Sequence, residues 1–190
     1  MTDTNVKTSP QPRARIAGAL YLLTIVTGAF AAFVSGKLLV YADAASLTAT
    51  ACYIGVTLLF YRIFKPVDSS LSLIAAVFSF AGCTLGALSV FHLVPPYIKS
   101  VNPLICFGVY CVLIGYLIFQ SNFLPRVLGA LMAFGGLGWL SFVSPELANY
   151  LSPYNLAPGI LGEGALTVWL LAKGVNAQRW LEQADAAGQS

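Results

Sequence analysis

Six continuous runs of apolar residues constrain the fold of this chain more than any other feature. They hold 17 to 24 residues each, which is about 26–36 Å of helix, and the hydrocarbon core of a membrane is about 30 Å thick. Inside hydrocarbon every backbone N–H and C=O must be paired within the protein, so only helices or closed barrels cross it. Barrel strands would alternate apolar and polar residues, which these runs do not. We therefore predict an all-α, polytopic bundle of six transmembrane helices at residues 16–34, 46–64, 71–94, 101–119, 127–144 and 155–171.

Composition and proline placement support this division. The chain is 58% hydrophobic and 9% charged, whereas soluble domains are about 25% charged. All ten prolines lie outside the middles of the runs, as expected because proline lacks an N–H and is tolerated only in loops and first helical turns. Pro103 and Pro158 are predicted in first turns, and Asp68 is predicted as an N-cap of the third helix.

Basic residues predict the orientation. With the N-terminus in the cytoplasm, only Lys37 and Lys99 fall outside. The cytoplasmic segments then hold the other eight: Lys7, Arg13, Arg15, Arg62, Lys65, Arg126, Lys173 and Arg179. This asymmetry follows the positive-inside rule, so both termini are predicted to be cytoplasmic. The net charge of +3 is too small to indicate nucleic acid as a partner.

The predicted domain organisation has three parts. Residues 1–14 form a disordered cytoplasmic tail and residues 15–172 the six-helix transmembrane domain. Residues 173–190 form a cytoplasmic tail, for which an interfacial helix using Val175, Trp180 and Leu181 and a solvated segment are equal alternatives. The first run has a basic flank like a signal peptide, but nineteen apolar residues are long for a signal core.

Glu163 is the residue most informative about function. It lies about eight residues into the last predicted helix, between Gly159, Gly162 and Gly164. A bare carboxylate at that depth costs several kcal/mol, so it should be protonated, paired or facing water. The glycines leave room for a neighbouring backbone or a ligand. A proton, cation or polar-substrate site and a purely structural, hydrogen-bonded glutamate are equally supported.

His92, the only histidine, lies near the outer end of the third helix. Glu163 is approached from the same outer face, so we hypothesise that the two meet and form a titrating pair. A histidine in the membrane interface, bonded to water or to a helix end, is the alternative. We name Glu163, His92, Gly159 and Gly162 as the candidate binding residues.

Enzymatic and metal chemistry find little support in the sequence. One histidine and four cysteines without a CxxC pair do not complete a usual zinc site, and no GxSxG or HExxH motif occurs. We expect no metal, no cofactor and no enzymatic activity. Gly82 with Gly86, and Gly129 with Ala133, have the spacing that lets helices approach closely, either within the bundle or between copies.

Several segments together resemble a known family. They are Arg15-Ile16-Ala17-Gly18 at the start, Leu124-Pro125-Arg126 in the middle, and Ala157-Pro158-Gly159 with Gly162-Glu163 near the end. Over about residues 13–180 the chain resembles a bacterial family of uncharacterised integral membrane proteins, catalogued as domain of unknown function 4386. The resemblance implies a multi-pass protein of the bacterial inner membrane, without known catalytic residues. The connections at 35–45 and 95–100 are shorter than in the family's pattern.

Two main functions are compatible with these observations. The first is binding or transport of an ion or small molecule through an outer-facing cavity near Glu163. The alternative is a non-enzymatic membrane partner or lipid-binding protein, in contact with the lipid bilayer and with a second copy or another membrane protein. Because a deep ionisable residue is a functional candidate by default, we favour the first.

Overall fold

The computed structural model describes residues 9–34, 38–98 and 101–188, and within them the chain is helical without any strand. Five long helices come first: α1 (Pro10–Phe33), α2 (Leu39–Phe64), α3 (Ser69–Val90), α4 (Pro103–Gln120) and α5 (Arg126–Leu140). The helices α6 (Pro145–Leu151), α7 (Leu156–Ala172) and α8 (Ala177–Gly188) follow. The 3-10 turns η2 (Pro96–Ile98) and η3 (Ser141–Val143) complete the regular structure.

The predicted all-α membrane fold is confirmed. Among the described residues, α1 to α5 are each long and apolar enough to cross a membrane, with α5 continued by η3. A sixth span is completed if α6 and α7, which are bent by 79° at a short break, count as one. Helix α7 alone corresponds to the sixth predicted run and, at 17 residues, is about 26 Å long. The protein is therefore a multi-pass membrane protein of five to six spans.

Two helices begin earlier than the apolar runs indicate. Helix α1 begins at Pro10, so residues 10–14 of the predicted disordered tail are helical, and residues 1–8 lie outside the described part. The side chain of Ser9 accepts a bond from the amide of Gln11, and Pro10 occupies the first turn, where its fixed φ suits a helix. Helix α2 begins at Leu39, seven residues before the predicted run, because helix formers continue beyond the apolar stretch.

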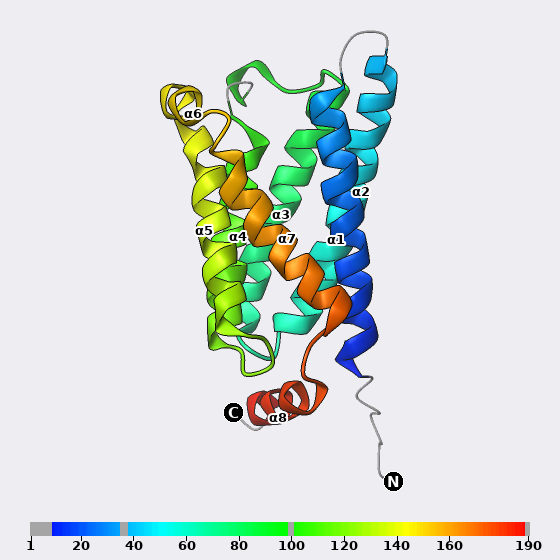
Figure 1. The fold of residues 1–190 in the computed structure, drawn as a ribbon, viewed down its shortest axis with the longest axis vertical. Coiled ribbons are helices and arrows are strands. Elements are labelled where there is room, and N and C mark those ends of the chain that lie inside the picture. The colour runs from blue at the N-terminus through cyan, green and yellow to red at the C-terminus, as the bar shows by residue number, and fades with distance from the viewer. Residues whose placement is uncertain (1–8, 35–37, 99–100, 189–190) are drawn as a thin grey trace.

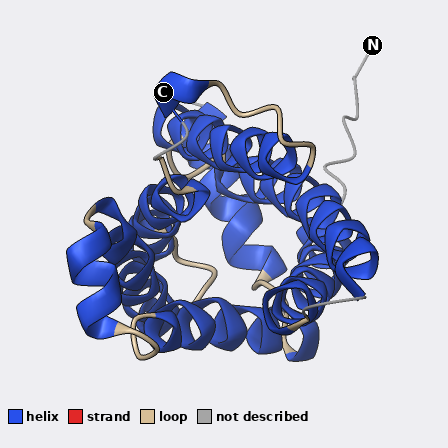
Figure 2. Cartoon of the chain, turned by 90° about the horizontal axis from the view of Figure 1, so that it is seen from above, coloured by secondary structure: helices blue, strands red, loops and turns tan. Residues whose placement is uncertain are grey.

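The six long helices form a closed ring (Figure 2). Each of α1 to α4 packs against the next helix in sequence, and α7 packs against both α5 and α1. Figure 1 shows α7 crossing the bundle diagonally, from α6 at one end toward the start of α1 at the other. The ring therefore brings the first and last spanning helices into contact.

Aromatic side chains fill the interior of the ring. Tyr21 packs edge-to-face on Tyr53 and Phe60, with ring centroids 5.5 and 5.9 Å apart. Phe60 contacts Phe64, which contacts Phe123 in the α4–α5 turn. These contacts form a column of rings along the bundle axis. The outer surface instead exposes residues such as Val26, Val77, Leu137 and Val168, as lipid permits and water would not.

One end of the bundle carries all seven basic residues that the structure describes. Arg13 and Arg15 lie at the start of α1, Arg62 and Lys65 at the end of α2, and Arg126, Lys173 and Arg179 around the turns beside α8. The start of α1 and helix α8 lie at this same end (Figure 1). Lys7, Lys37 and Lys99 lie outside the described residues.

The C-terminal segment forms α8, which lies across this end of the bundle (Figure 1). The indole N–H of Trp180 donates to the carbonyl of Ile63 at 2.8 Å, and the amide of Asn176 donates to the carbonyl of Phe123 at 3.1 Å. Val175 and Trp180 are buried. The C-terminal segment therefore packs against the end of the bundle, through Val175 and Trp180.

Candidate functional site

Glu163 lies on the inner face of α7 as its eighth residue and is buried. Its Oε1 accepts a hydrogen bond from the indole Nε1 of Trp139 on α5 at 3.0 Å. The thiol of Cys111 on α4 donates to the same oxygen at 3.4 Å. Two neighbouring helices thus fix one carboxyl oxygen, and Tyr21 on α1 also hydrogen-bonds the carboxyl group.

Three tyrosines complete the surroundings of this carboxyl group. The hydroxyls of Tyr21 on α1 and Tyr53 on α2 lie 3.4 Å apart, and both residues interact electrostatically with Glu163. The ring of Tyr110 on α4 lies 5.7 Å from that of Tyr53, and Tyr110 also interacts with Glu163. We call the six residues Glu163, Trp139, Cys111, Tyr21, Tyr53 and Tyr110 the glutamate cluster.

The glutamate cluster draws side chains from five helices, and no lysine, arginine or histidine of the described residues takes part in it. A carboxylate in such surroundings would lack a counter-charge, and placing a bare charge at this depth costs several kcal/mol. The arrangement therefore favours a carboxyl group that carries a proton or binds a cation.

Two buried hydroxyls, one within the glutamate cluster and one farther along α7, lack hydrogen-bond partners of good geometry among the described residues. They belong to Tyr110 and to Thr167, which lies one turn after Glu163 on the same face of α7. The Thr57 hydroxyl near Tyr110 is engaged with Ser79, 2.5 Å away, and with the carbonyl of Tyr53. Because an unpaired buried hydroxyl costs about 1–3 kcal/mol, these groups are available to an ion or water inside the ring.

The glycines of α7 serve contact with α5. A Cβ atom on Gly159 would collide with the indole of Trp139, and one on Gly162 would collide with the carbonyl oxygen of Leu131. The space beside these two glycines was predicted to admit either a neighbouring backbone or a ligand, and helix α5 fills it. The missing side chain at Gly159 also lets the Trp139 indole reach the Glu163 carboxyl group.

His92 is not part of the site. It follows α3 with φ 56°, is exposed, and donates its amide to the carbonyl of Ser89 at 3.2 Å. Glu163 is buried in α7, across the ring from α3, and no interaction joins the two. The hypothesis that they meet rested on equal depth, and depth along the bundle axis does not fix where on the ring a residue lies.

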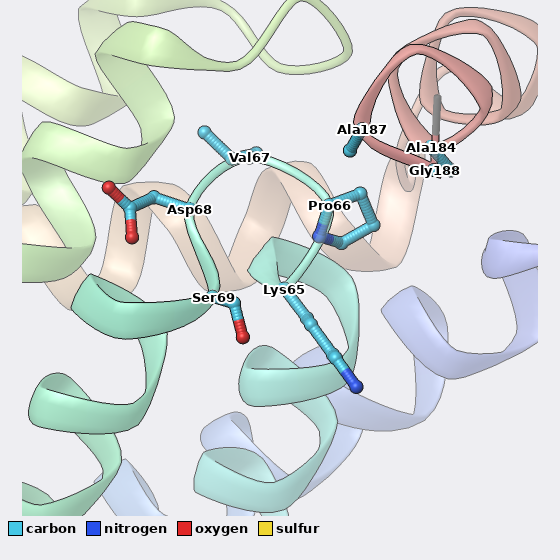
Figure 3. Close-up of a pocket in the computed structure, with 8 residues that line it drawn as sticks. All are labelled: Lys65, Pro66, Val67, Asp68, Ser69, Ala184, Ala187 and Gly188. Carbon is cyan, nitrogen blue, oxygen red and sulfur yellow. The ribbon is translucent and has the colours of Figure 1, made fainter. Parts of the chain in front are cut away.

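The two best-formed hollows in the described part of the chain lie elsewhere than at Glu163. One, of about 430 Å³, is lined by the α2–α3 turn and by Ala184, Ala187 and Gly188 of α8 (Figure 3). The other, of about 280 Å³, lies between α1 and α2. The predicted outer-facing cavity beside Glu163 and His92 is therefore not one of them, and packed side chains surround the carboxyl group instead.

The partners of Glu163 were not identified from the sequence. One signal was present, because Tyr21, Tyr53 and Tyr110 lie far from the ends of their spans, whereas membrane tyrosines usually lie at the interface. A tyrosine in mid-span needs a partner for its hydroxyl. Trp139 and Cys111 carry no comparable signal. The small-residue pairs are used within the bundle, since Gly82 faces Phe107 of α4 and Gly129 faces Gly115 of α4, while Gly86 faces open space.

Comparison with known proteins confirms the family resemblance for part of the chain. The profile of a family described as a domain of unknown function (DUF4386) matches residues 97–174, which include α4 to α7. An uncharacterised protein of Archaeoglobus fulgidus is 27% identical over 125 residues, covering 63% of this chain and 75% of the relative. No solved structure matches the chain significantly. The matched segment contains Tyr110, Cys111, Trp139 and Glu163 of the glutamate cluster.

Proposed function

We propose that this multi-pass membrane protein binds a small cation, in the first place a proton, at Glu163 and supports its transport across the bacterial inner membrane. The observation that carries the proposal is a carboxyl group inside a ring of six helices, fixed by two donors and without a basic partner in the cluster. Ionisable groups in such positions mark ion pathways and proton relays in membrane proteins.

The hydrogen bonds around Glu163 suit a carboxyl group that binds and releases a proton or a cation. Trp139 and Cys111 both donate to Oε1 and Tyr21 is a third hydrogen-bond partner, so the carboxyl group is held in place to carry a proton or to ligate a cation. The hydroxyls of Tyr21 and Tyr53 supply further oxygen atoms nearby. Because neither of the two best-formed hollows reaches Glu163, a proton or a bare monovalent cation fits this conformation better than a larger substrate.

Exchange with the outer face is the shorter route. Glu163 is seven residues from Leu156 and nine from Ala172, which is about 10 Å to the outer end of α7 and about 14 Å to the other. The break between α6 and α7 lies at the outer end. The basic residues gathered at the end that holds the start of α1 and helix α8 support the proposed orientation, with this end in the cytoplasm.

The second candidate is a non-enzymatic membrane partner, and the packed interior favours it. A bundle filled by aromatic side chains needs no ligand, and a second set of large apolar residues faces outward. In that case Glu163 is a protonated, structural residue, and the lipid-facing surface contacts lipid, a second copy or another protein. An intramembrane enzyme remains the least supported reading, so we propose no enzymatic activity.

Carbodiimide labelling tests the proposal, because dicyclohexylcarbodiimide reacts with protonated carboxyl groups in apolar surroundings. The purified protein in detergent is labelled over a pH series and mapped by mass spectrometry. We expect label at Glu163 that falls as pH rises, is lost in Glu163→Gln, and is retained in Glu146→Gln, which changes an exposed carboxyl group of α6. Label independent of pH, or none at a folded Glu163, contradicts proton exchange.

Proton flux separates the two candidate functions. Proteoliposomes with an internal pH-sensitive dye should acidify faster with the protein than without it, and Glu163→Gln should abolish the difference. Equal flux from Glu163→Gln and the unchanged protein contradicts transport, and unchanged folding of that variant then supports the membrane partner. Cysteine labelling at positions 150 and 179 from each side of the membrane tests the proposed orientation.

A further inference from the structure

A groove on the surface between α1 and α2 forms the second hollow of the described residues. Leu20 of α1 and Gly55, Leu58 and Leu59 of α2 line it, and Arg62 closes one end. Its volume is about 280 Å³. The groove exists because Gly55 has no side chain, so only a methyl group of Leu20 lies over that position.

The groove is apolar along its length and cationic at one end. From Gly55 to Arg62 is two turns of α2, or about 10 Å, and Arg62 and Leu58 are both exposed. Arg62 lies at the end of the bundle where the basic residues gather. Arg15 on α1 and Lys65 on α2 are exposed at the same end of this helix pair, so positive charge continues around the mouth of the groove.

We propose that this groove binds one acyl chain of an anionic phospholipid, whose phosphate pairs with Arg62. The apolar walls fit a hydrocarbon chain, and the guanidinium group fits phosphate through paired N–H donors. Basic pockets between spanning helices on the cytoplasmic side are suited to anionic head groups. The proposal is independent of the function proposed for Glu163, which does not line the groove.

Thermal unfolding in detergent tests the site with two lipids that share the same acyl chains. Dioleoylphosphatidylglycerol should raise the unfolding midpoint of the delipidated protein by several degrees more than dioleoylphosphatidylcholine does. Arg62→Gln should abolish this difference. Arg126→Gln should keep it, because it removes an exposed arginine of α5 that lies at the same end of the bundle but does not line the groove. Soluble glycerol 3-phosphate should have no effect, because it has no acyl chain.

A second variant tests the groove itself. Gly55→Leu fills the space, so native mass spectrometry should show about tenfold weaker retention of phosphatidylglycerol. Gly86→Leu is the matched control, because a side chain there meets no atom within 4 Å, and it should retain the lipid. Equal stabilisation by both lipids overturns the proposal, as does a phosphatidylglycerol preference that survives in Arg62→Gln. An equal loss of the phosphatidylglycerol preference in Arg62→Gln and Arg126→Gln overturns the proposal in favour of an unspecific charge effect. Stabilisation by glycerol 3-phosphate overturns the role of the acyl chain.

Discussion

The two halves of the ring are built differently. In the half formed by α4, α5 and α7, glycines bring backbones into contact: a Cβ atom on Gly115 would lie 2.7 Å from the carbonyl oxygen of Gly129, and one on Gly136 would lie 2.7 Å from that of Gly108. In the half formed by α1, α2 and α3, Gly18 and Gly82 pack against α7 and α4 of the other half, and the remaining described glycines leave space. A Cβ atom on Gly28 or Gly86 would meet nothing within 4 Å, and one on Gly55 would meet only the end of Leu20.

One half of the ring positions the Glu163 carboxyl group, and the other half leaves space for small shifts of its helices. Trp139 and Cys111 donate to Glu163, and both lie in the half formed by α4, α5 and α7, which we call the tight half. Contact between backbones there leaves little freedom in helix position. The family profile covers this half as well, from residue 97 to 174. The half formed by α1, α2 and α3, which we call the loose half, contributes the rings of Tyr21 and Tyr53 and the groove between α1 and α2. Small shifts of a helix matter less for these features.

The largest expected effect comes from enlarging a glycine in the tight half. Gly115→Leu would force α4 away from the backbone of α5 at Gly129 and Ala133, and we expect a loss of about 3 kcal/mol. The measurement is reversible unfolding in mixed detergent micelles. Gly86→Leu in the loose half should change stability by less than about 0.5 kcal/mol. Similar losses in both variants would erase the distinction between the halves.

Removing one donor to Glu163 should have the next largest effect. Trp139→Phe keeps most of the ring and deletes the N–H that bonds Oε1 at 3.0 Å, at a cost of about 1.5 kcal/mol. It should also increase the rate of carbodiimide labelling at Glu163, since the carboxyl group is less restrained. Trp169→Phe, which changes a half-buried indole elsewhere on α7, is the control. Equal behaviour of both variants would contradict the positioning role of Trp139.

A hydroxyl pair in the loose half should contribute less to stability than the hydrogen bond between Trp139 and Glu163. Thr57 and Ser79 lie 2.5 Å apart between α2 and α3, and a double-mutant cycle with Thr57→Val and Ser79→Ala should give a coupling of about 0.6 kcal/mol, the average for such bonds in membranes. Unfolding in mixed micelles of the four proteins measures it. A coupling above that of Trp139 with Glu163 would reverse the ranking of the two halves.

The smallest expected effect has the opposite sign. Gly28→Ala adds a methyl group in open space on α1 and raises helix propensity, so stability should increase by about 0.5 kcal/mol. Gly136→Ala should instead lower it, because its new methyl group meets the carbonyl oxygen of Gly108 and the side chain of Val112. Matched unfolding curves decide the sign, and two changes of the same sign would refute the comparison.

The sequence by itself determined that lipid surrounds the protein, that its fold is an all-α bundle of five to six spans, and several local features. Asp68 caps α3 through the amide of Leu71 at 2.8 Å, and Pro103 lies in the first turn of α4, both as predicted. These features follow from single segments, because apolar length and capping act within one helix. Glu163 was likewise identified as a buried carboxyl group from its depth in one run.

Only the tertiary structure decided which residues meet. Depth in the membrane placed His92 and Glu163 at similar levels, but ring closure set α3 and α7 on opposite sides and turned Glu163 toward Trp139 and Cys111. Apolar patterning cannot fix these pairings, because lipid rewards outward-facing and inward-facing apolar residues alike. Helix rotation is set instead by the close fit of small residues, and that fit exists only between helices.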